Sequence, residues 1–462
     1  MPLSELGCPH RSLASTSYRT GERHEVELAR KLFGGRRIGF VCAAKQRKKL
    51  PTLRRDPLNI VDLEAQLDQQ LQRPRVTNPD AVRQAATAWS HAVWSVAESA
   101  GPPILTASEI EHAFAIARRP VFVFGVHRSG TTLVRDLLDH HPALSVLPAE
   151  GTMLTNFEWH LKRLEPDGWP RFLGCEWLRR RANPINQHPY WLLGRSSAEG
   201  SPYVEFGRAL LAWWPLVGSR LGSRTTSWSL VAIALAYAHC TTGFRTAHPL
   251  ERWVEKTPTN ERFLARLMAE FPEARLLHVV RHPFAVYASS RQAVRNSGHP
   301  SSDERRILRQ MRLSYRAAAS RSVRPASGSY LLVRYEDLLE DTAGSVRRMA
   351  SFLGIQPLPV MMQPTANGIP TPSNSSFDSN KVAGKLNRRP ADGAFNALTQ
   401  RDRERLSAML ADDVGKLGYP LAPLPALRRQ LLQIRIHTGW MADRFRARWV
   451  RFLSAHPRQR EL

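Results

Sequence analysis

The sequence predicts an α/β protein in which a parallel β-sheet is flanked by helices. Three short apolar runs, at 121–126, 274–280 and 330–339, have the length and composition of buried strands. Each run is followed by a segment with helical spacing of apolar residues, and a turn with two glycines joins the first run to its helix. Strands that alternate with helices favour a parallel sheet covered on both faces.

The residues before this pattern divide into two parts. Residues 1–57 are basic, with the cluster KQRKK near their end, and we expect a surface arm; a nucleic-acid contact is the alternative interpretation. Residues 58–119 are expected to form a helical lead-in that packs on the main domain. This follows from apolar residues that recur at helical spacing over 58–73 and 78–100.

The main domain is expected at 120–420. After the first strand and the glycine turn, TTLVRDLLDHHP is a helix that ends before Pro142. Residues 151–250 are expected to be mostly helical and to face the acceptor, with SLVAIALAYAHC as a buried helix. The run 330–339 is expected to be a strand that continues into a loop, and 357–393 is a Pro/Asn/Ser-rich loop region.

The tail, 421–462, is basic. PLAPLPA is expected to be a hinge, and 427–453 an amphipathic helix rich in arginine. Such a helix can lie on an anionic membrane or contact a partner. The alternative is that its apolar stripe packs on the domain to which it belongs.

Composition limits the classes of partner and cofactor. The chain has 462 residues and a formal net charge of +26, which favours anionic partners. No basic stretch with interleaved aromatic residues is present, so we expect no nucleic-acid ligand. The four cysteines are far apart and lack zinc-ligand spacing, so we expect no metal site.

The sequence also carries an expectation about location. No run of 18 or more apolar residues occurs, and the first residues lack the layout of a secretory signal. We therefore expect a cytoplasmic protein, with the tail as a contact to the inner face of the membrane.

The turn in GVHRSGTTLV (125–134) carries the strongest functional signal. Its glycines allow the backbone to approach a ligand, and the helix that follows aims N–H groups and a positive dipole end at one point. Arg128 can pair with anionic oxygens, and Thr131 and Thr132 can donate hydrogen bonds. The Lys-Ser/Thr pair of a nucleoside-triphosphatase loop is missing, and no strand clearly ends in an acidic magnesium ligand. The loop therefore predicts an anion that is held by protein cations alone.

Three further segments carry candidate polar residues. In HVVRHPFAVYASS, Arg281 ends a strand and Ser289 follows about two helical turns later, so both can hold a second phosphate. In WVEKTPTN, a polar segment expected in a turn before the second strand, Lys256 is a candidate cation beside a reacting group. In LPAEGTML, Glu150 is a candidate general base. Each also has a structural interpretation, as a surface arginine or a capping glutamate for example.

In this order, GVHRSGTTLVRDLLDHHP, PAEG, WVEKTP, HVVRHPFAVYASS, VRYEDL and FLG resemble the sulfotransferases. They are nearer the bacterial and protein-tyrosine branch than the cytosolic aryl branch, and the resemblance covers about 120–390. It implies a P-loop-like α/β fold and 3′-phosphoadenosine-5′-phosphosulfate (PAPS) as the donor, held without a metal. The RKG-type nucleotide motif of the aryl branch is absent. SNSSF (373–377) and Lys385 stand where the family closes over the nucleotide.

The resemblance also implies roles for single residues. Arg281 and Ser289 match the pair that grips the 3′-phosphate. Glu150 matches the catalytic base of the protein-tyrosine branch, although the interval after the loop differs slightly, and Lys256 matches a basic residue near the transferring sulfonate. Arg128 joins these two as a third catalytic residue. The 5′-phosphosulfate loop is matched by Arg128, Ser129, Gly130, Thr131 and Thr132.

We therefore expect an enzyme that moves a sulfonate from PAPS to an acceptor hydroxyl by in-line transfer. A carbohydrate, a glycolipid and a small metabolite all fit as acceptor, and the basic surface favours an anionic or membrane-associated one. If Glu150 is not the base, His127 and His140 are the next candidates. Two other classes stay open: a nucleotide kinase or NTPase, and a non-enzymatic protein that binds anionic lipid or another polyanion.

Overall fold

The computed structural model contains two units by internal contacts, Met1–Asp56 and Pro57–Leu462. All residues that the structure describes belong to the second unit. They are 60–71, 79–181, 193–221, 226–244, 249–296, 303–322, 328–372, 382–386 and 395–455. The predicted basic arm therefore lies outside the described residues, as does SNSSF at 373–377.

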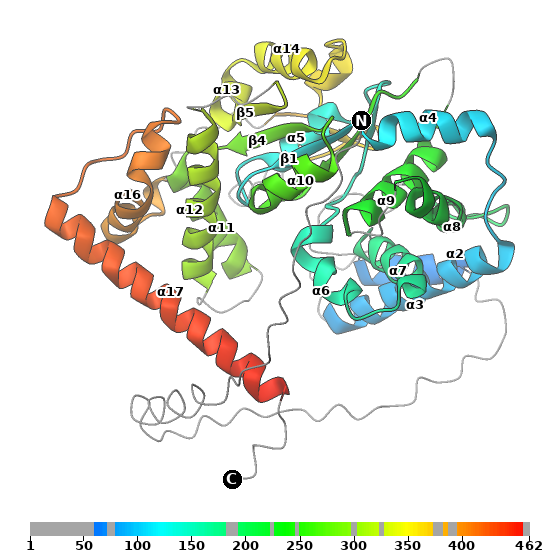
Figure 1. Ribbon diagram of the computed structural model, residues 1–462, viewed down its shortest axis with the longest axis horizontal. Coiled ribbons are helices and arrows are strands. Elements are labelled where there is room, and N and C mark those ends of the chain that lie inside the picture. The colour runs from blue at the N-terminus through cyan, green and yellow to red at the C-terminus, as the bar shows by residue number, and fades with distance from the viewer. Residues whose placement is uncertain are drawn as a thin grey trace, which may run out of the picture. The chain divides into compact units, whose positions relative to one another are not determined.

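A five-stranded parallel sheet with the order β2-β3-β1-β4-β5 forms the centre of the protein (Figure 1). β1 is the middle strand, and all of its side chains are buried, as the continuous apolar run predicts. In the register, Val123 of β1 lies opposite Lys256 of β3, and Phe124 lies opposite His278 of β4. The strands are β1 (Pro120–Phe124), β2 (Leu144–Val146), β3 (Arg252–Lys256), β4 (Arg275–Val280) and β5 (Tyr330–Arg334).

Alternate side chains of β1 enter different clusters on the two faces of the sheet. Val121 and Val123 pack with α5 (Thr131–Leu138) and α14 (Thr342–Leu353). Phe122 and Phe124 enter the larger cluster, which is rich in tryptophan and includes α9 (Thr226–Thr241). The predicted α/β class, a P-loop-like parallel sheet flanked by helices, is confirmed.

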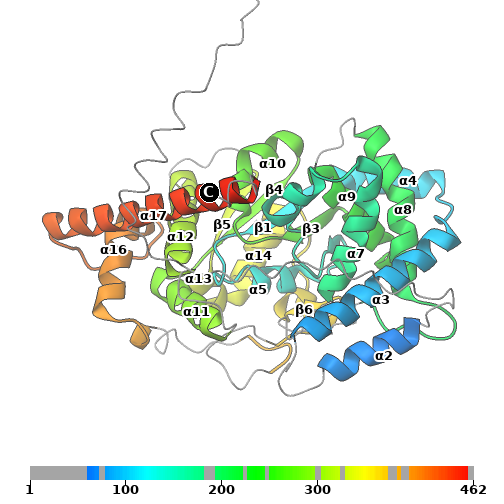
Figure 2. The same cartoon turned by 90° about the horizontal axis from the view of Figure 1, so that it is seen from below.

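Figure 2 shows two further groups of helices, one to the left of the sheet and one to its right. In the first group, α3 packs on α7 and α8, α8 packs on α9, and α4 contacts β3. Its members are α2 (Ile60–Leu71), α3 (Pro79–Ala100), α4 (Ala107–Ala117), α6 (Glu158–Leu161), α7 (Trp169–Arg181), α8 (Pro202–Arg220) and α9, with the π-helix η1 (Met153–Phe157) and the 3₁₀ helix η2 (Pro166–Gly168). The expectation that 151–250 is mostly helical, with a buried helix near 229–240, is confirmed.

The second group surrounds a separate apolar cluster beside β4. It consists of α11 (Pro283–Asn296), α12 (Asp303–Ser322), α16 (Gln400–Gly415) and α17 (Ala426–Ala455). The remaining elements are η3 (Asn260–Phe263), α10 (Leu264–Glu270), α13 (Tyr335–Glu340), η4 (Pro359–Met362) and the hairpin β6 (Thr365–Ala366) and β7 (Ile369–Pro370).

The structure corrects the expectation for WVEKTPTN. Its first part is not a polar turn but strand β3, which is buried along its whole length. The strand tolerates its charged residues because they have partners inside the protein. Arg252 donates from Nε to the carbonyl oxygen of Leu353 at 3.1 Å, and Glu255 accepts hydrogen bonds described below. β2 was not predicted either, since it has only three residues.

The expected loop after the strand at 330–334 is also wrong. Residues 335–340 form helix α13 instead. Glu336 and Asp337 lie in its first turn, where negative charge interacts favourably with the helix dipole, and Leu338 is buried. This short helix follows the strand without a break, so the sequence pattern alone predicts one continuous run of strand and loop.

Among the described residues, no helix has both the length and the apolar character needed to cross a membrane.

Candidate active site

The predicted site residues converge at one edge of the sheet. Parallel strands place their carboxyl ends at the same edge, where ligands of open α/β sheets bind. The turn after β1 carries Arg128, β3 ends at Lys256, and Arg281 follows β4 directly. Because the order is β3-β1-β4, the turn lies between the other two cations. Strands are about 4.8 Å apart, so the ends of β3 and β4 are separated by roughly 10 Å.

Two glycines allow the turn after β1 to form. Gly125 has φ +149°, and a Cβ atom there would lie 2.2 Å from the carbonyl oxygen of Val279. Gly130 has φ +105°, and a Cβ atom there would lie 2.3 Å from the ring of Tyr335. Both positions therefore exclude larger residues by conformation and by space.

The turn leads directly into the N-terminus of a helix, a place where proteins can bind anions. Gly130 is the N-cap of α5 and offers no side-chain acceptor, so it leaves the first amide donors of the helix available to a ligand. The Ser129 side chain is fully buried, and its hydroxyl has no hydrogen-bond partner among the residues that the structure describes. A buried hydroxyl in that state fits a site that is completed by an anionic group of a ligand.

A cationic centre lies on the β4 side of the turn. Arg128 donates from Nε to the hydroxyl of Ser289 at 3.0 Å, and Arg281 Nη1 lies 3.4 Å from the backbone oxygen of Arg128. The Arg281 guanidinium stacks on the ring of Tyr335 at 4.4 Å from the centroid. Burial lowers the pKa of Arg128, and the charge of Arg281 lowers it further. Two cations held this close favour a ligand with concentrated negative charge.

An ion pair lies on the β3 side. Lys256 Nζ is 2.6 Å from Glu150 Oε1, with the Lys256 side chain 5% exposed and that of Glu150 38% exposed. Burial acts to raise the pKa of Glu150, but the charge and hydrogen bond of Lys256 outweigh it, and the pKa lies below 4.5. Glu150 is therefore ionised at neutral pH. Its side chain is also accessible from solvent to the hydroxyl group of an acceptor.

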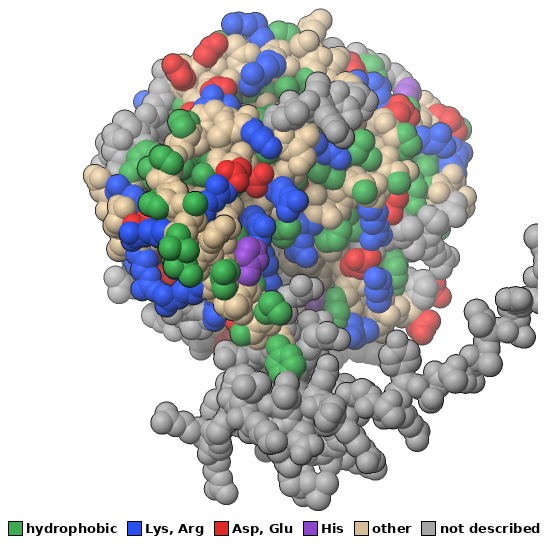
Figure 3. Space-filling model, turned by 60° about the vertical axis from the view of Figure 1, so that its left-hand side comes forward, with side chains coloured by type: hydrophobic (Ala, Val, Ile, Leu, Met, Phe, Trp, Pro, Cys, Tyr) green, Lys and Arg blue, Asp and Glu red, His purple; other side chains and the backbone are tan. Residues whose placement is uncertain are grey.

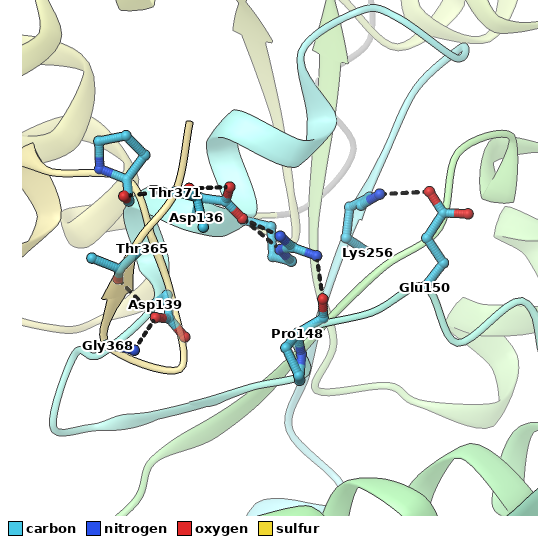
Figure 4. A network of polar contacts seen from close by, with 10 residues as sticks. Asp136, Asp139, Pro148, Glu150, Lys256, Thr365, Gly368 and Thr371 are labelled. Carbon is cyan, nitrogen blue, oxygen red and sulfur yellow. Dashed lines mark hydrogen bonds and ion pairs between the residues drawn. The ribbon is translucent and has the colours of Figure 1, made fainter. Parts of the chain in front are cut away.

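Hydrogen bonds hold the backbone on both sides of Glu150, and Figure 4 shows the one at Pro148. Upstream, Arg135 of α5 donates from Nη1 to the carbonyl oxygen of Pro148 at 2.6 Å. Downstream, the amide of Gly151 donates to Glu255 Oε1 at 2.9 Å, and the amide of Thr152 donates to Thr257 Oγ1 at 2.9 Å. We call 148–152 the base loop.

Glu255 is fully buried at the centre of the downstream contacts. Besides Gly151, it accepts hydrogen bonds from the Thr257 hydroxyl and from Asn260 Nδ2, the latter at 3.2 Å. Burial raises its pKa to about 7, against the effect of the hydrogen bonds from Thr257 and Gly151. The end of β3 thus supplies Lys256 and also fixes the loop that carries its partner.

The opposite side of α5 holds the β6–β7 hairpin (Figure 4). Asp139 accepts from the hydroxyl of Thr365 at 2.7 Å and from the amide of Gly368 at 2.9 Å. Asp136, which pairs with Arg135, accepts from the hydroxyl of Thr371 at 3.0 Å. Burial raises the pKa of Asp136, against the charge of Arg135. The same helix therefore contacts the base loop and this hairpin.

The two alternative bases occupy different places. His127 reaches solvent but has protein on most sides, and this reduced solvation lowers its pKa below 6.5; Glu150 opposes the shift and Lys256 adds to it. His140 lies beyond the far end of α5, next to Gly368 of the hairpin. His127 is therefore the alternative that shares the electrostatic environment of the ion pair.

Two other expectations concern the closing segment and metals. Lys385 is exposed and has a backbone contact to Val382. Among the described residues, no group of three or more histidine, cysteine, aspartate or glutamate side chains could hold a metal ion.

The sequence analysis did not single out Arg135, Glu255 or Thr257. Arg135 has the appearance of an ordinary helix residue in the sequence, yet only 4% of it is exposed. Glu255 and Thr257 flank a predicted site residue, and recognition of β3 as a strand would have drawn attention to them. Tyr335, which supports Arg281, lies in a segment that was expected to be a loop.

Comparison with known proteins gives one family match. Residues 120–359 match the model described as Sulfotransferase family, which is more than half of the chain. Comparison with curated proteins gives no match.

Several solved structures are similar at low identity. The sulfotransferase domain of the Synechococcus PCC 7002 olefin synthase is 20% identical, with a TM-score of 0.39, and the match covers 66% of this chain and 96% of that chain. Sulfotransferase STF1 from Mycobacterium tuberculosis H37Rv is 17% identical, with a TM-score of 0.34 and coverage of 82% and 99%. STF9 from Mycobacterium avium is 15% identical, with a TM-score of 0.35 and coverage of 75% and 87%. Similarity at this level says nothing about donor or acceptor.

Proposed function

This chain belongs to the sulfotransferase family and is a transferase of sulfonate groups, and from that premise we propose that it uses PAPS as donor, without a metal, and an acceptor hydroxyl. One observation carries the proposal. A phosphate-type loop lies between two cationic centres, and in the one on the β3 side the cation is paired directly with a part-exposed carboxylate, Glu150. A donor with two anionic groups and one reacting end matches that asymmetry.

The β4 side suits the 3′-phosphate of the donor. Arg281 is fixed by the ring of Tyr335, and the Ser289 hydroxyl already accepts a hydrogen bond from Arg128. Guanidinium groups bind phosphate strongly because their N–H donors match its oxygens. The amides at the start of α5 and the buried hydroxyl of Ser129 suit the 5′-phosphosulfate, which PAPS supplies as the reactive group.

The β3 side suits the chemistry. Glu150 accepts the proton of the acceptor hydroxyl while that oxygen attacks sulfur in line, and the S–O bond to the 5′-phosphate breaks. Lys256 interacts with the negative charge that develops on the sulfonate and the bridging oxygen. When Lys256 turns toward that charge, its ion pair with Glu150 weakens. The pKa of Glu150 then rises, and the carboxylate becomes a stronger base.

We further propose that the acceptor approaches Glu150 from solvent, past the helices of 151–250. The basic surface of the chain suits an anionic or membrane-associated acceptor, and a carbohydrate, a glycolipid or a small metabolite would fit equally.

The test is calorimetric titration with 3′,5′-adenosine bisphosphate in the presence of a chelator. We expect the wild type to bind, and Arg281→Ala to bind roughly 10- to 100-fold more weakly, since a charge-assisted phosphate contact contributes about 1.5–3 kcal/mol. Arg83→Ala, on the exposed surface of α3, is the matched control and should bind as the wild type does. Binding of ATP with magnesium, and none of the bisphosphate, would show a kinase-type site instead.

A further inference from the structure

One face of the C-terminal helix α17 packs on the domain. Ile436 and Trp440 are buried against α12 and α16. The indole of Trp440 donates to the carbonyl oxygen of Arg305 at 3.2 Å, and Gln433 Nε2 donates to that of Ala408 at 2.7 Å. These contacts fix how the helix is rotated about its axis.

The opposite face of α17 carries a continuous apolar stripe. The five residues of this stripe are spaced four, three, seven and four positions apart in the sequence, with an exposed threonine in the middle of the long interval. Because a helix has 3.6 residues per turn, these positions align along one side of it. Figure 3 shows hydrophobic side chains among Lys and Arg side chains on the side of the molecule that carries α17. The stripe consists of Leu427 (70% exposed), Leu431 (59%), Ile434 (60%), Met441 (69%) and Phe445 (45%).

This arrangement differs from ordinary surface exposure. Single exposed apolar residues are normal, whereas a contiguous line of large ones indicates an interaction surface. Among the side chains of α17 that the structure describes, the expectation that an apolar stripe packs on the protein itself holds for Ile436 and Trp440. The helix has a second apolar side, which is exposed in the part of the chain that the structure describes.

The charge of the helix indicates which kind of surface it meets. Residues 426–455 contain seven arginines and one aspartate, with no lysine and no glutamate. Of the arginines, Arg435 is exposed next to the stripe, and Arg428, also exposed, pairs with Glu404. Pairing the stripe with a second copy of α17 would bring two such basic helices together, and like charges repel. The basic arm 1–57 would be disfavoured for the same reason.

We propose that α17 binds an anionic lipid bilayer, with the apolar stripe among the acyl chains at the interface and the arginines at the phosphate headgroups. A basic amphipathic helix has the two attractive components that such binding requires. The helix lies flat and does not span the bilayer. This inference does not depend on which nucleotide or acceptor the enzyme uses.

The experiment measures co-sedimentation of the full chain with two kinds of vesicle, phosphatidylcholine alone and an equal mixture with phosphatidylglycerol. We expect binding to the anionic vesicles that weakens as salt is added, and little binding to the neutral ones. The variant Leu431→Gln/Ile434→Gln should bind at least about tenfold more weakly, since each buried apolar side chain adds to membrane affinity. The matched control, Ile104→Gln/Leu313→Gln, changes two exposed apolar residues outside α17 and should bind normally.

A second pair of variants tests the charge. Arg435→Gln should lower binding and reduce its salt dependence, while Arg83→Gln on α3 should not. All variants should keep the wild-type melting temperature, because each changed side chain is exposed. Equal binding of the stripe variant and its control would overturn the proposal. So would self-association in sedimentation velocity, without lipid, that the stripe variant abolishes, since the stripe would then pair with a second copy.

Discussion

Glu150 and Lys256 form the pair on which the proposed chemistry depends. Each would be unfavourable alone in this environment, and their 2.6 Å contact keeps the carboxylate ionised. Because the Glu150 pKa is below its ordinary 4.5, the base is in its active form from neutral pH down to that value, and activity that depends on it is lost as pH falls through the lowered pKa.

The change Glu150→Gln tests the base. It keeps the shape of the side chain and removes its ability to accept a proton, so turnover should fall about 10²–10⁴-fold. The affinity for 3′,5′-adenosine bisphosphate should stay within about threefold, since the donor contacts lie elsewhere. Steady-state kinetics and calorimetry measure the two effects.

His127→Asn serves as the comparison for that change. His127 lies in the same electrostatic environment as Glu150. If Glu150 is the base, the His127 variant should lower the turnover number much less than the Glu150 variant does. The opposite ranking of the two variants would move the base to His127.

At the scale of elements, β3 performs two tasks. It ends in Lys256, and the residues on either side of this lysine hold the amides of the base loop. α5 holds the same loop from upstream and binds the β6–β7 hairpin through Asp136 and Asp139. The position of Glu150 is therefore set by two elements that are far apart in sequence.

The change Thr257→Val tests this positioning. Valine keeps the volume but cannot accept the hydrogen bond from the Thr152 amide, so the variant loses a contact that holds the base loop. We expect kcat to fall roughly tenfold or more, because small displacements of a catalytic group are costly, while the KM for the donor is nearly unchanged.

Thr257→Ser provides the control for that test. It restores the hydroxyl without the methyl group and should recover most of the activity. A variant that loses stability but keeps kcat would show that Thr257 only supports the fold.

At the scale of the whole molecule, two buried glutamates link folding to pH. Burial raises the pKa of Glu255 and of Glu261 to about 7, from an ordinary value of 4.5. Groups with a raised pKa in the folded state stabilise the protein fully below the unfolded pKa, and this contribution is lost as pH rises toward the folded pKa. The stabilising contribution of these two glutamates is therefore lost between pH 4.5 and pH 7.

The change Glu261→Gln tests this linkage away from the base loop. Between pH 5 and pH 7 the unfolding free energy of the wild type should fall relative to that of the variant, by at most roughly 3 kcal/mol. Denaturant unfolding at several pH values measures it. Glu340→Gln, an exposed glutamate at the end of α13, should follow the wild type; identical pH profiles for all three proteins would contradict the prediction.

The sequence alone determined the α/β class and the parts of the site that depend on local pattern. A buried apolar run before Gly125 and a helix after Gly130 are enough to predict an anion-binding turn, because strand, turn and helix are contiguous in the chain. The same pattern predicted Arg281 at the end of β4, and both strands and their helices are confirmed.

Only the tertiary structure decided what surrounds these residues. β3 was missed because buried Arg252 and Glu255 contradict an apolar strand pattern, and each has one partner 100 or more residues away in sequence. The pairing of Lys256 with Glu150, the contact of Arg135 with Pro148 and the orientation of α17 depend on which elements meet in space. Periodicity shows that a face is apolar, but only packing determines which apolar face is buried and which is left exposed.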